Sequence, residues 1–336
     1  MSLDNQSMQL APMSVIIPTY NSAAYLGEAV DSALAQALPP RQIIVVDDGS
    51  TDQTPQLIQR YASRVQYVRQ TNQGVSAARN RGLELANQPL VAFLDADDVW
   101  HPLKLKLQIA AMNAIPSLVL LGTRSFDWPA RSMPRSMGCP AVSHVSWRQL
   151  VVKNRLVTSS VVARRDAIEK AGIFDTALQG PEDRDMWLRL ARLGGVANLD
   201  QPLTGYRELH GSVSKQAVRC HTSMRRIIQK LDETGQLRGE WLLRRKALSQ
   251  IDNSVACIWS SAGETRNALK LLLRSLVLYP LPYRGSEVDA SFERSRRLAV
   301  YLLRLLHLKS CPTLSNSSAV PAQNALGRHS GEALYV

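Results

Sequence analysis

Five carboxylates stand directly after two runs of apolar residues. They are Asp47, Asp48, Asp95, Asp97 and Asp98. Apolar runs of this kind are typical of strands buried on both faces, and open α/β sheets bind ligands outside the carboxyl ends of such strands. Acids brought to one edge repel one another unless a cation joins them. We therefore expect a divalent metal that carries a diphosphate, held by hard oxygen ligands.

Short apolar strands alternate with helical patterns in the first hundred residues. Strands are predicted at 14–18, 43–46, 65–68 and 90–95, and helices at 26–38, 54–62 and 75–86. Strands and helices that alternate in this way fold into a parallel sheet with helices on its faces. The sequence predicts an α/β fold with a Rossmann-like, doubly wound, mostly parallel sheet.

The pattern loosens after Trp100 and becomes helical toward the C-terminus. We expect helices at 103–113, 166–171 and 182–193, strands at 118–122 and 158–163, and a surface loop at 127–146. Leucine-rich helical faces follow at 224–231, 241–259, 264–278 and 294–308. The predicted domains are a flexible leader (1–13), a catalytic domain (14–215), a helical C-terminal region (216–310) and a disordered tail (311–336).

Positive charge is concentrated in the helical part. The chain carries a net charge of +12, and residues 219–309 hold 17 Lys+Arg against 8 Asp+Glu. Such asymmetry indicates a segment that faces anionic material, either a membrane surface or nucleic acid. Aromatic residues make up only 6% of the chain and no base-stacking motif accompanies the basic stretch, so we expect no nucleic acid partner.

The cysteines and the hydropathy indicate a cytoplasmic protein. Four cysteines stand far apart with no CxxC spacing, which argues against a zinc site or a disulfide framework. Residues 1–13 lack a secretory signal, and no stretch reaches the roughly 18 apolar residues that span a bilayer. Two interpretations of the basic C-terminal helices stay open: they pack as a bundle, or they hold the protein peripherally on the inner face of the cell membrane.

Five strings carry a family resemblance. They are 14–21 (SVIIPTYN), 45–52 (VVDDGSTD), 72–80 (NQGVSAARN), 93–98 (FLDADD), and 182–183 (ED) with 187–189 (WLR). In order and spacing they resemble the family 2 inverting glycosyltransferases with the GT-A fold, of the non-processive bacterial type. The resemblance implies a nucleotide-sugar donor, Mn²⁺ or Mg²⁺, and transfer to an acceptor hydroxyl with inversion.

The resemblance implies roles for the acids of the 93–98 string. Asp97 ligates the metal, while Asp95 reaches the ribose or metal-bound waters and Ala96 lies against the nucleotide-sugar. Asp98 is a further metal ligand or the cap of the helix that follows. His210 is a third metal ligand or a phosphate contact, with a solvent-facing histidine as the alternative. Without the resemblance, these acids would be read as a strand-end pair that caps the next helix.

The nucleotide base is expected at the ends of the first two strands. By resemblance it is held by Pro18, Thr19, Tyr20 and Asn21, and the Tyr20 ring has a flat face suited to stacking on uracil, unless it is an ordinary core aromatic. One carboxylate of Asp47 or Asp48 accepts a hydrogen bond from the uracil imide or the ribose. The alternative for these acids is a polar turn with Asx hydrogen bonds.

The segment with Gly74 and Arg79 resembles a second loop and helix that contact the nucleotide in the family. The guanidinium of Arg79 offers charge-assisted hydrogen bonds to a phosphate or to an aspartate. The alternative is a solvated arginine on a helix.

Glu182 and Asp183 form the expected catalytic element. An acceptor hydroxyl is a poor nucleophile, so a carboxylate must take its proton as it attacks. We assign Asp183 as this general base and Glu182 to the acceptor, with Asp185 as the rival base. Acids in the first turn of a helix are also favoured by its dipole alone. Many relatives have an aromatic residue at the position of Arg184.

The predicted function is metal-dependent transfer of a sugar, most simply from a UDP-sugar, to a hydroxyl of a cell-surface glycan, a glycolipid or a lipid-linked oligosaccharide. This function belongs to polysaccharide biosynthesis of the cell envelope. The alternatives are a metal-dependent nucleotidyltransferase, although residues 14–22 lack a Gly-rich phosphate loop, and an inert nucleotide-sugar-binding or nucleic-acid-binding protein.

Overall fold

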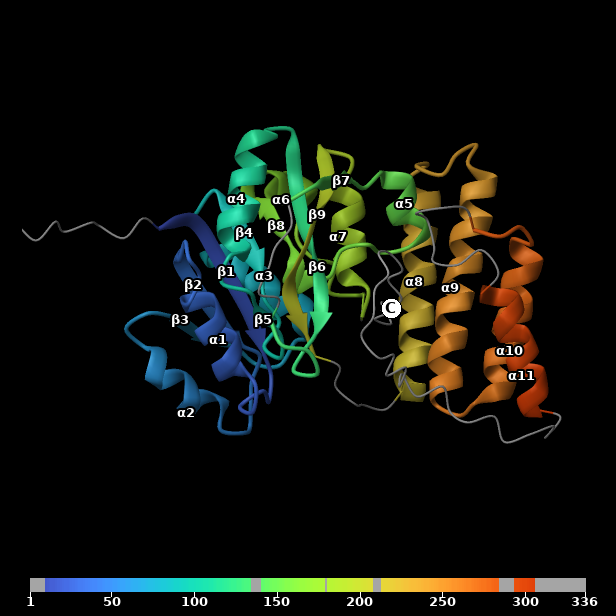
Figure 1. Cartoon of the computed structure of the whole chain (residues 1–336), viewed down its shortest axis with the longest axis horizontal. Helices are drawn as coiled ribbons and strands as arrows, with labels where there is room; N and C mark the ends of the chain where they lie inside the picture. Colours follow the sequence, from blue (N-terminus) through green and yellow to red (C-terminus); the bar gives the residue numbers. More distant parts are fainter. Residues whose placement is uncertain (1–9, 134–139, 179, 208–212, 284–292, 306–336) are drawn as a thin grey trace, which may run out of the picture. The chain divides into compact units, whose positions relative to one another are not determined.

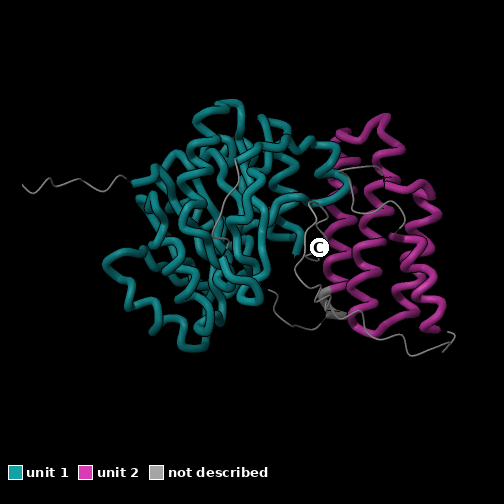
Figure 2. Tube along the Cα trace, in the orientation of Figure 1, with its two compact units in different colours: residues 1–210 teal, residues 211–336 magenta. Residues whose placement is uncertain are grey.

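A computed structural model describes residues 10–133, 140–178, 180–207, 213–283 and 293–305. The chain divides into two compact units, residues 1–210 and 211–336 (Figure 2). Each unit has its own hydrophobic core. The predicted domain boundaries stay a prediction, and the calls on residues 1–9, His210 and 311–336 fall outside the described residues.

The first half of unit 1 is the parallel sheet that the sequence predicts. Its strands lie in the order β3-β2-β1-β4 and pair in parallel. They are β1 (Ala11–Thr19), β2 (Pro40–Asp47), β3 (Gln66–Arg69) and β4 (Leu90–Phe93), connected by α1 (Leu26–Leu34), α2 (Thr54–Ile58), the 3-10 turn η1 (Gln59–Tyr61) and α3 (Val75–Leu85). The α/β class of the fold is confirmed (Figure 1).

The second half of the sheet is mixed. Its strands are β5 (Val99–Trp100), β6 (Leu118–Asp127), β7 (Val142–His144), β8 (Val162–Arg164) and β9 (Gly195–Tyr206). Strand β8 runs antiparallel to both β4 and β6, whereas β6 and β9 are parallel. Helices α4 (Lys104–Ala114), α5 (Trp147–Val152), α6 (Arg165–Ala171) and α7 (Glu182–Leu190) complete the unit.

Close packing of α3 on the sheet fixes the region around the strand ends. The α3 residue Gly82 faces β1 so closely that a Cβ there would lie 2.3 Å from Cγ2 of Ile16. On the other side of the sheet, Val15 and Ile17 pack in a buried cluster with Ala29 and Val30 of α1. Alternate residues of β1 therefore bury toward opposite helices, which explains its continuous apolar sequence.

The structure differs from the predicted elements in several places. The strand expected at 90–95 ends at Phe93, so Asp95 and Asp97 lie in a loop rather than on one face of a strand. The strand expected at 158–163 begins with a 3-10 turn, η2 (Thr158–Ser160). Strand β9 was not predicted, because Asn198, Asp200 and Gln201 break its apolar pattern.

Unit 2 consists, in its described part, of α8 (Val213–Glu233), α9 (Trp241–Ser261), α10 (Thr265–Leu278) and α11 (Glu293–Leu305). Its core is built on α9, whose Ala256 packs with Ala268 and Leu272 of α10 and Tyr301 of α11. On α9, the buried carboxylate of Asp252 also binds Arg274 of α10. Among the described helices, none is long and apolar enough to cross a membrane.

Candidate functional site

The parallel register brings the predicted residues to one edge of the sheet. Thr19 at the end of β1 pairs with Asp47 at the end of β2, and the amide of Leu94, just after β4, donates to the carbonyl of Ile16. The segments that follow these three strands therefore start side by side. Pro18, Thr19, Asp47 and Asp48 lie at this edge, as the sequence predicts for the carboxyl ends of parallel strands.

Asp47 and Asp48 are both buried and already accept several hydrogen bonds. Oδ1 of Asp47 accepts from the Ser50 amide at 2.8 Å, and its Oδ2 from the Tyr67 hydroxyl at 2.6 Å. Asp48 accepts from the Gly74 amide at 2.7 Å. Asp47 thus makes the hydrogen bonds of a polar Asx turn, which was the alternative to nucleotide binding. Asp48 fixes the loop that leads into α3.

Tyr20, Asn21 and Gly74 surround this pair of acids. The Tyr20 side chain is 49% exposed, so the alternative of a core aromatic is wrong. Asn21 adopts a positive φ of 49°, and its Oδ1 accepts from the Thr51 amide at 2.7 Å. Gly74 also has a positive φ, of 89°, and nothing lies within 4 Å of the position that a Cβ would take. Open space at Gly74 leaves its backbone accessible to a ligand.

The loop after β4 holds three acids in different environments. Asp95 and Asp97 are partly buried, whereas Asp98 is almost completely buried. Burial and the neighbouring Asp95 raise the pKa of Asp97 to about 6. Burial, Asp97 and Asp95 also raise the pKa of Asp98 well above its ordinary value. These carboxylates therefore repel one another, and a cation between Asp95 and Asp97 would relieve the repulsion.

Arg207 holds this loop from the end of β9. Its backbone amide donates to Oδ1 of Asp98 at 3.0 Å, and its Nε donates to the carbonyl of Asp97 at 2.9 Å. Nη2 of Arg207 binds Glu28 of α1 at 2.9 Å, and the guanidinium lies over the Tyr25 ring. Asp98 therefore contacts this segment, and the idea that it caps the following helix is wrong, since the N-cap of α4 is Leu103.

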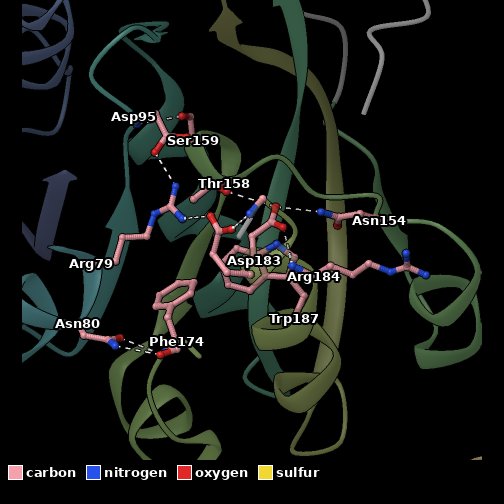
Figure 3. A network of polar contacts seen from close by, with 12 residues as sticks. Arg79, Asn80, Asp95, Asn154, Thr158, Ser159, Phe174, Asp183, Arg184 and Trp187 are labelled. Carbon is pink, nitrogen blue, oxygen red and sulfur yellow. Dashed lines mark hydrogen bonds and ion pairs between the residues drawn. The ribbon is translucent and has the colours of Figure 1, made fainter. Parts of the chain in front are cut away.

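Arg79 joins the loop after β4 to α7 (Figure 3). Its Nη2 lies 2.8 Å from Oδ1 of Asp95, and its Nη1 lies 2.6 Å from Oε1 of Glu182. The Arg79 side chain is only 4% exposed, so the interpretation as a solvated arginine is wrong. The two carboxylates raise the pKa of this guanidinium further although its burial opposes the charge.

The three acids at the start of α7 have three different partners. Glu182 binds Arg79, and Asp185 forms an ion pair with Arg189 at 2.9 Å. Arg184 donates instead to the carbonyl oxygens of Leu150 and Val151 at the end of α5. Asp183 is held by neutral side chains: it accepts from Asn154 at 2.9 Å and from Thr158 at 3.2 Å.

The environment of Asp183 favours its protonated form. Burial and the neighbouring Glu182 raise the pKa of Asp183 to about 7, while Arg79 and the hydrogen bond from Asn154 partly oppose this shift. A carboxylate with such a pKa can both take and release a proton near neutral pH. Asp183 thus lies next to Glu182, a carboxylate that forms an ion pair with Arg79.

Sequence reasoning missed the segment that connects the two groups of acids. Thr158 of η2 donates to Oδ2 of Asp183, and the next residue, Ser159, accepts from the Asp95 amide at 3.0 Å (Figure 3). Asn80 of α3 makes two hydrogen bonds with the backbone of Phe174. The sequence TSS at Thr158–Ser160 matches no known motif. Its position just before a predicted strand is the one sequence signal that could have identified it.

The residues present fit a divalent metal only in part. Within the described residues, no three His, Cys, Asp or Glu side chains are arranged to hold an ion. Asp95 and Asp97 nevertheless form a pair of hard oxygen ligands, and Mg²⁺ commonly binds through one or two carboxylates together with the phosphates of a substrate. Asp98 is engaged with Arg207, and His210 lies outside the described residues.

The chain is similar in sequence to known glycosyltransferases. The family model described as Glycosyl transferase family 2 matches residues 14–162. An uncharacterized glycosyltransferase of Rickettsia prowazekii is 30% identical over 195 residues, which are 55% of this chain and 60% of that protein. TuaG of Bacillus subtilis, named for teichuronic acid biosynthesis, is 26% identical over 68% of this chain and 92% of its own length. The chain spans 60% or less of the length of the Rickettsia relatives.

Solved structures share the fold at low sequence identity. TarS of S. aureus matches with a TM-score of 0.57 and 21% identity, over 80% of this chain and 49% of that chain. A mannosyltransferase of Pyrobaculum calidifontis, solved with GDP-Man and Mn²⁺, matches with a TM-score of 0.53 and 20% identity, over 91% and 92% of the two chains. The fold of unit 1 is that of the GT-A glycosyltransferases.

Proposed function

Residues 14–162 match the family model Glycosyl transferase family 2, and on this premise we propose that the chain moves a sugar with inversion from a nucleotide-sugar donor to an acceptor hydroxyl. The observation that carries the proposal is the Arg79 bridge. This buried guanidinium ties Asp95, at the proposed donor site, to Glu182, beside the proposed base. Donor and base would thereby be held at a fixed separation.

The donor would lie at the edge formed by β1, β2 and β4. The exposed Tyr20 ring offers a stacking face for the base, and Pro18, Thr19 and Asn21 flank it. Asp47 or Asp48 would bind the base or the ribose through lone pairs that remain beside their internal hydrogen bonds, and the backbone at Gly74 and Ala96 would line the site. UDP is our first choice of nucleotide.

Asp97 and Asp95 would hold Mn²⁺ or Mg²⁺ together with the diphosphate. A bound divalent metal neutralises the negative charge that develops on a departing nucleoside diphosphate. Support comes from the raised pKa of Asp97, because two crowded carboxylates of this kind are stabilised by a cation. Asp98, which binds the Arg207 amide, would shape the loop rather than bind the ion.

Asp183 would act as the general base. In the proposed step, its carboxylate takes the proton of the acceptor hydroxyl while the oxygen forms a bond to the anomeric carbon, and the bond from that carbon to the diphosphate breaks on the opposite face. Glu182 is occupied by Arg79 and would orient the acceptor, and Asp185 is occupied by Arg189. The acceptor would be a glycan, glycolipid or lipid-linked oligosaccharide of the cell envelope, as the name of TuaG suggests.

Calorimetric titration of UDP, GDP and dTDP with Mn²⁺, and again with EDTA, tests the donor site. We expect one nucleotide to bind in a metal-dependent way, and Asp97→Asn to abolish the metal dependence. Asp183→Asn should bind this nucleotide normally but lose transfer, whereas Asp185→Asn should retain transfer. Full transfer by folded Asp183→Asn would refute the assignment of the base, and the absence of any nucleotide binding would refute the proposed function.

A further inference from the structure

Large apolar side chains are exposed at one end of the helical unit. Trp241 and Leu242, at the start of α9, are 67% and 48% exposed, and Val277 and Leu281, at and beyond the end of α10, are 74% and 59% exposed. Arg245 joins these two helix ends, because its guanidinium donates to the carbonyl oxygens of residues 277 and 278 at 3.0 and 2.8 Å. Arg245 therefore brings the start of α9 next to the end of α10, the two helix ends that carry or adjoin these four residues.

Cations lie within this surface. Arg245 covers the last turn of α10, and Lys246 lies with its Nζ 5.5 Å from the centre of the Tyr279 ring. Arg244 is half exposed and pairs with Asp232 at 2.6 Å. The helical region as a whole carries 17 Lys+Arg against 8 Asp+Glu over residues 219–309. Arg245 and Lys246 thus add positive charge near the exposed start of α9, in a region whose sequence is basic overall.

We propose that this surface docks onto an anionic lipid membrane. We call it the Trp241 surface and define it by Trp241, Leu242, Arg244, Arg245, Val277 and Leu281. A tryptophan suits the membrane interface because its ring is largely apolar while its N–H seeks a polar partner. The apolar side chains enter the boundary between headgroups and acyl chains, while the arginines lie at the level of the lipid phosphates.

Charge favours lipid over a second copy of the chain as the occupant. Two copies that met through this surface about a twofold axis would bring Arg244 and Arg245 close to the same residues of the other copy. Like charges in a desolvated contact oppose association. Anionic headgroups complement the positive charge of Arg245 and Lys246, and the hydrocarbon side of the lipid accepts Trp241 and Val277, so a membrane suits both the charged and the apolar residues of the surface.

Vesicle sedimentation with the full chain tests the proposal without donor or acceptor. We expect binding to phosphatidylcholine vesicles that contain phosphatidylglycerol, little binding to phosphatidylcholine alone, and weaker binding in high salt. Val277→Glu should lower the partition coefficient by about tenfold, since a charge replaces an inserted apolar side chain beside anionic lipid. Trp241→Phe should retain binding.

The matched control is Val218→Glu on α8. Val218 is 56% exposed and adjoins Ala217, which packs on Val255 and Ile258 toward the opposite end of α9 from Trp241. This variant should bind vesicles as the wild type does. Equal losses in Val218→Glu and Val277→Glu would overturn the proposal, as would absence of vesicle binding by the wild type.

Two further readouts separate this proposal from its rivals. Sedimentation velocity without lipid should show that the wild type does not self-associate through this surface. Self-association that Val277→Glu removes would make the surface a contact between copies and overturn the proposal. Calorimetric titration of the donor nucleotide into Val277→Glu should give the wild-type affinity. Loss of vesicle binding with intact nucleotide binding is therefore the expected pattern, and it does not depend on the proposed function.

Discussion

At the scale of single residues, the contrast between Asp183 and its neighbours is the most informative feature. Glu182 and Asp185 on the same turn are each paired with an arginine, whereas Asp183 receives hydrogen bonds from Asn154 and Thr158. Burial and the neighbouring Glu182 raise the pKa of Asp183 to about 7, so this carboxylate can take up a proton near neutral pH.

This contrast predicts the pH dependence of transfer. The base must be deprotonated to act, and the pKa of Asp183 is raised to about 7, so turnover should rise with pH around pH 7 and level off above it. Asn154→Ala removes a hydrogen bond to the charged form and should move this rise to higher pH, with kcat near the wild-type value at pH 9. A pH profile of kcat for both proteins is the measurement, and an unchanged midpoint would contradict the role of Asn154.

At the scale of elements, the end of β9 supports the loop after β4. Arg207 binds backbone and side-chain atoms of Asp97 and Asp98, and Glu28 of α1 accepts from both Arg207 and Trp128. Residues of this kind act on a metal site through its ligands, and their loss commonly weakens metal affinity by roughly 10- to 100-fold. Glu28 and Arg207, which are far apart in the sequence, are thereby in contact beside the proposed donor site.

Arg207→Ala should therefore weaken Mn²⁺-dependent nucleotide binding by about tenfold or more, and Glu28→Gln should weaken it less, because the amide still accepts a hydrogen bond. Calorimetric titration measures both. Arg124→Ala is the matched control, since it breaks an exposed ion pair with Asp200 in the same unit without contacting the loop. Equal effects of the Arg124 and Arg207 substitutions would contradict this prediction.

Helix α4 contains a buried lysine without a hydrogen-bond partner for its Nζ in the described structure. Lys104 is completely buried, and its Nζ lies 4.0 Å from the centre of the Trp100 ring. Burial holds the pKa of this amine well below its ordinary value. Between this lowered pKa and the ordinary pKa of lysine, the unfolded chain binds more of this proton than the folded chain does, so the contribution of Lys104 to stability rises with pH over that range.

Lys104→Met should raise the free energy of unfolding at pH 7 by about 1–3 kcal/mol, since it removes an unpaired buried polar group. The gain should shrink as the pH approaches about 10, where the unfolded lysine also loses its proton. Urea unfolding at several pH values measures it. Lys106→Met, on the exposed side of the same helix, is the control, and a gain independent of pH would contradict the stated cause.

The strands and helices in the N-terminal half of unit 1 could be predicted from the sequence, because strand patterns and family motifs fall on the same residues there. The run from Val15 to Pro18 is apolar and buried, and it ends at the proposed site, so the pattern and the motif point to the same element. Strand β9 escaped prediction, since its polar residues Asn198 and Gln201 are accommodated by tertiary contacts that no local pattern reveals. Arg79 and its ion-pair partner Glu182 are 103 positions apart in the sequence. A periodic pattern of apolar residues gives no information on contacts over such a separation.

At the scale of the whole molecule, the two units have separate cores. The core of unit 1 is built on the sheet, and that of unit 2 on residues such as Ala256 and Leu272. Units with their own cores commonly unfold as separate cooperative transitions. Ligand that binds only one folded unit stabilises only the transition of that unit.

Urea unfolding of the full chain should therefore show two transitions. Nucleotide with Mn²⁺ should move one of them to higher urea concentration, and Leu272→Ala should move the other to lower concentration, at a cost of about 2–5 kcal/mol for a buried leucine. Far-UV circular dichroism and tryptophan fluorescence together measure both. A single transition that responds to both changes would show that the units unfold as one.

The adjacent positions of Thr158 and Ser159 bear on how such an enzyme can change its substrates. One residue holds the side chain of Asp183 and the next holds the backbone of Asp95, so an insertion or deletion inside η2 disturbs the acceptor and donor halves together. Length changes are tolerated best in exposed loops that make few such contacts. Length changes that alter acceptor preference are therefore expected in exposed loops outside η2, where the contacts of Thr158 and Ser159 to Asp183 and Asp95 are kept.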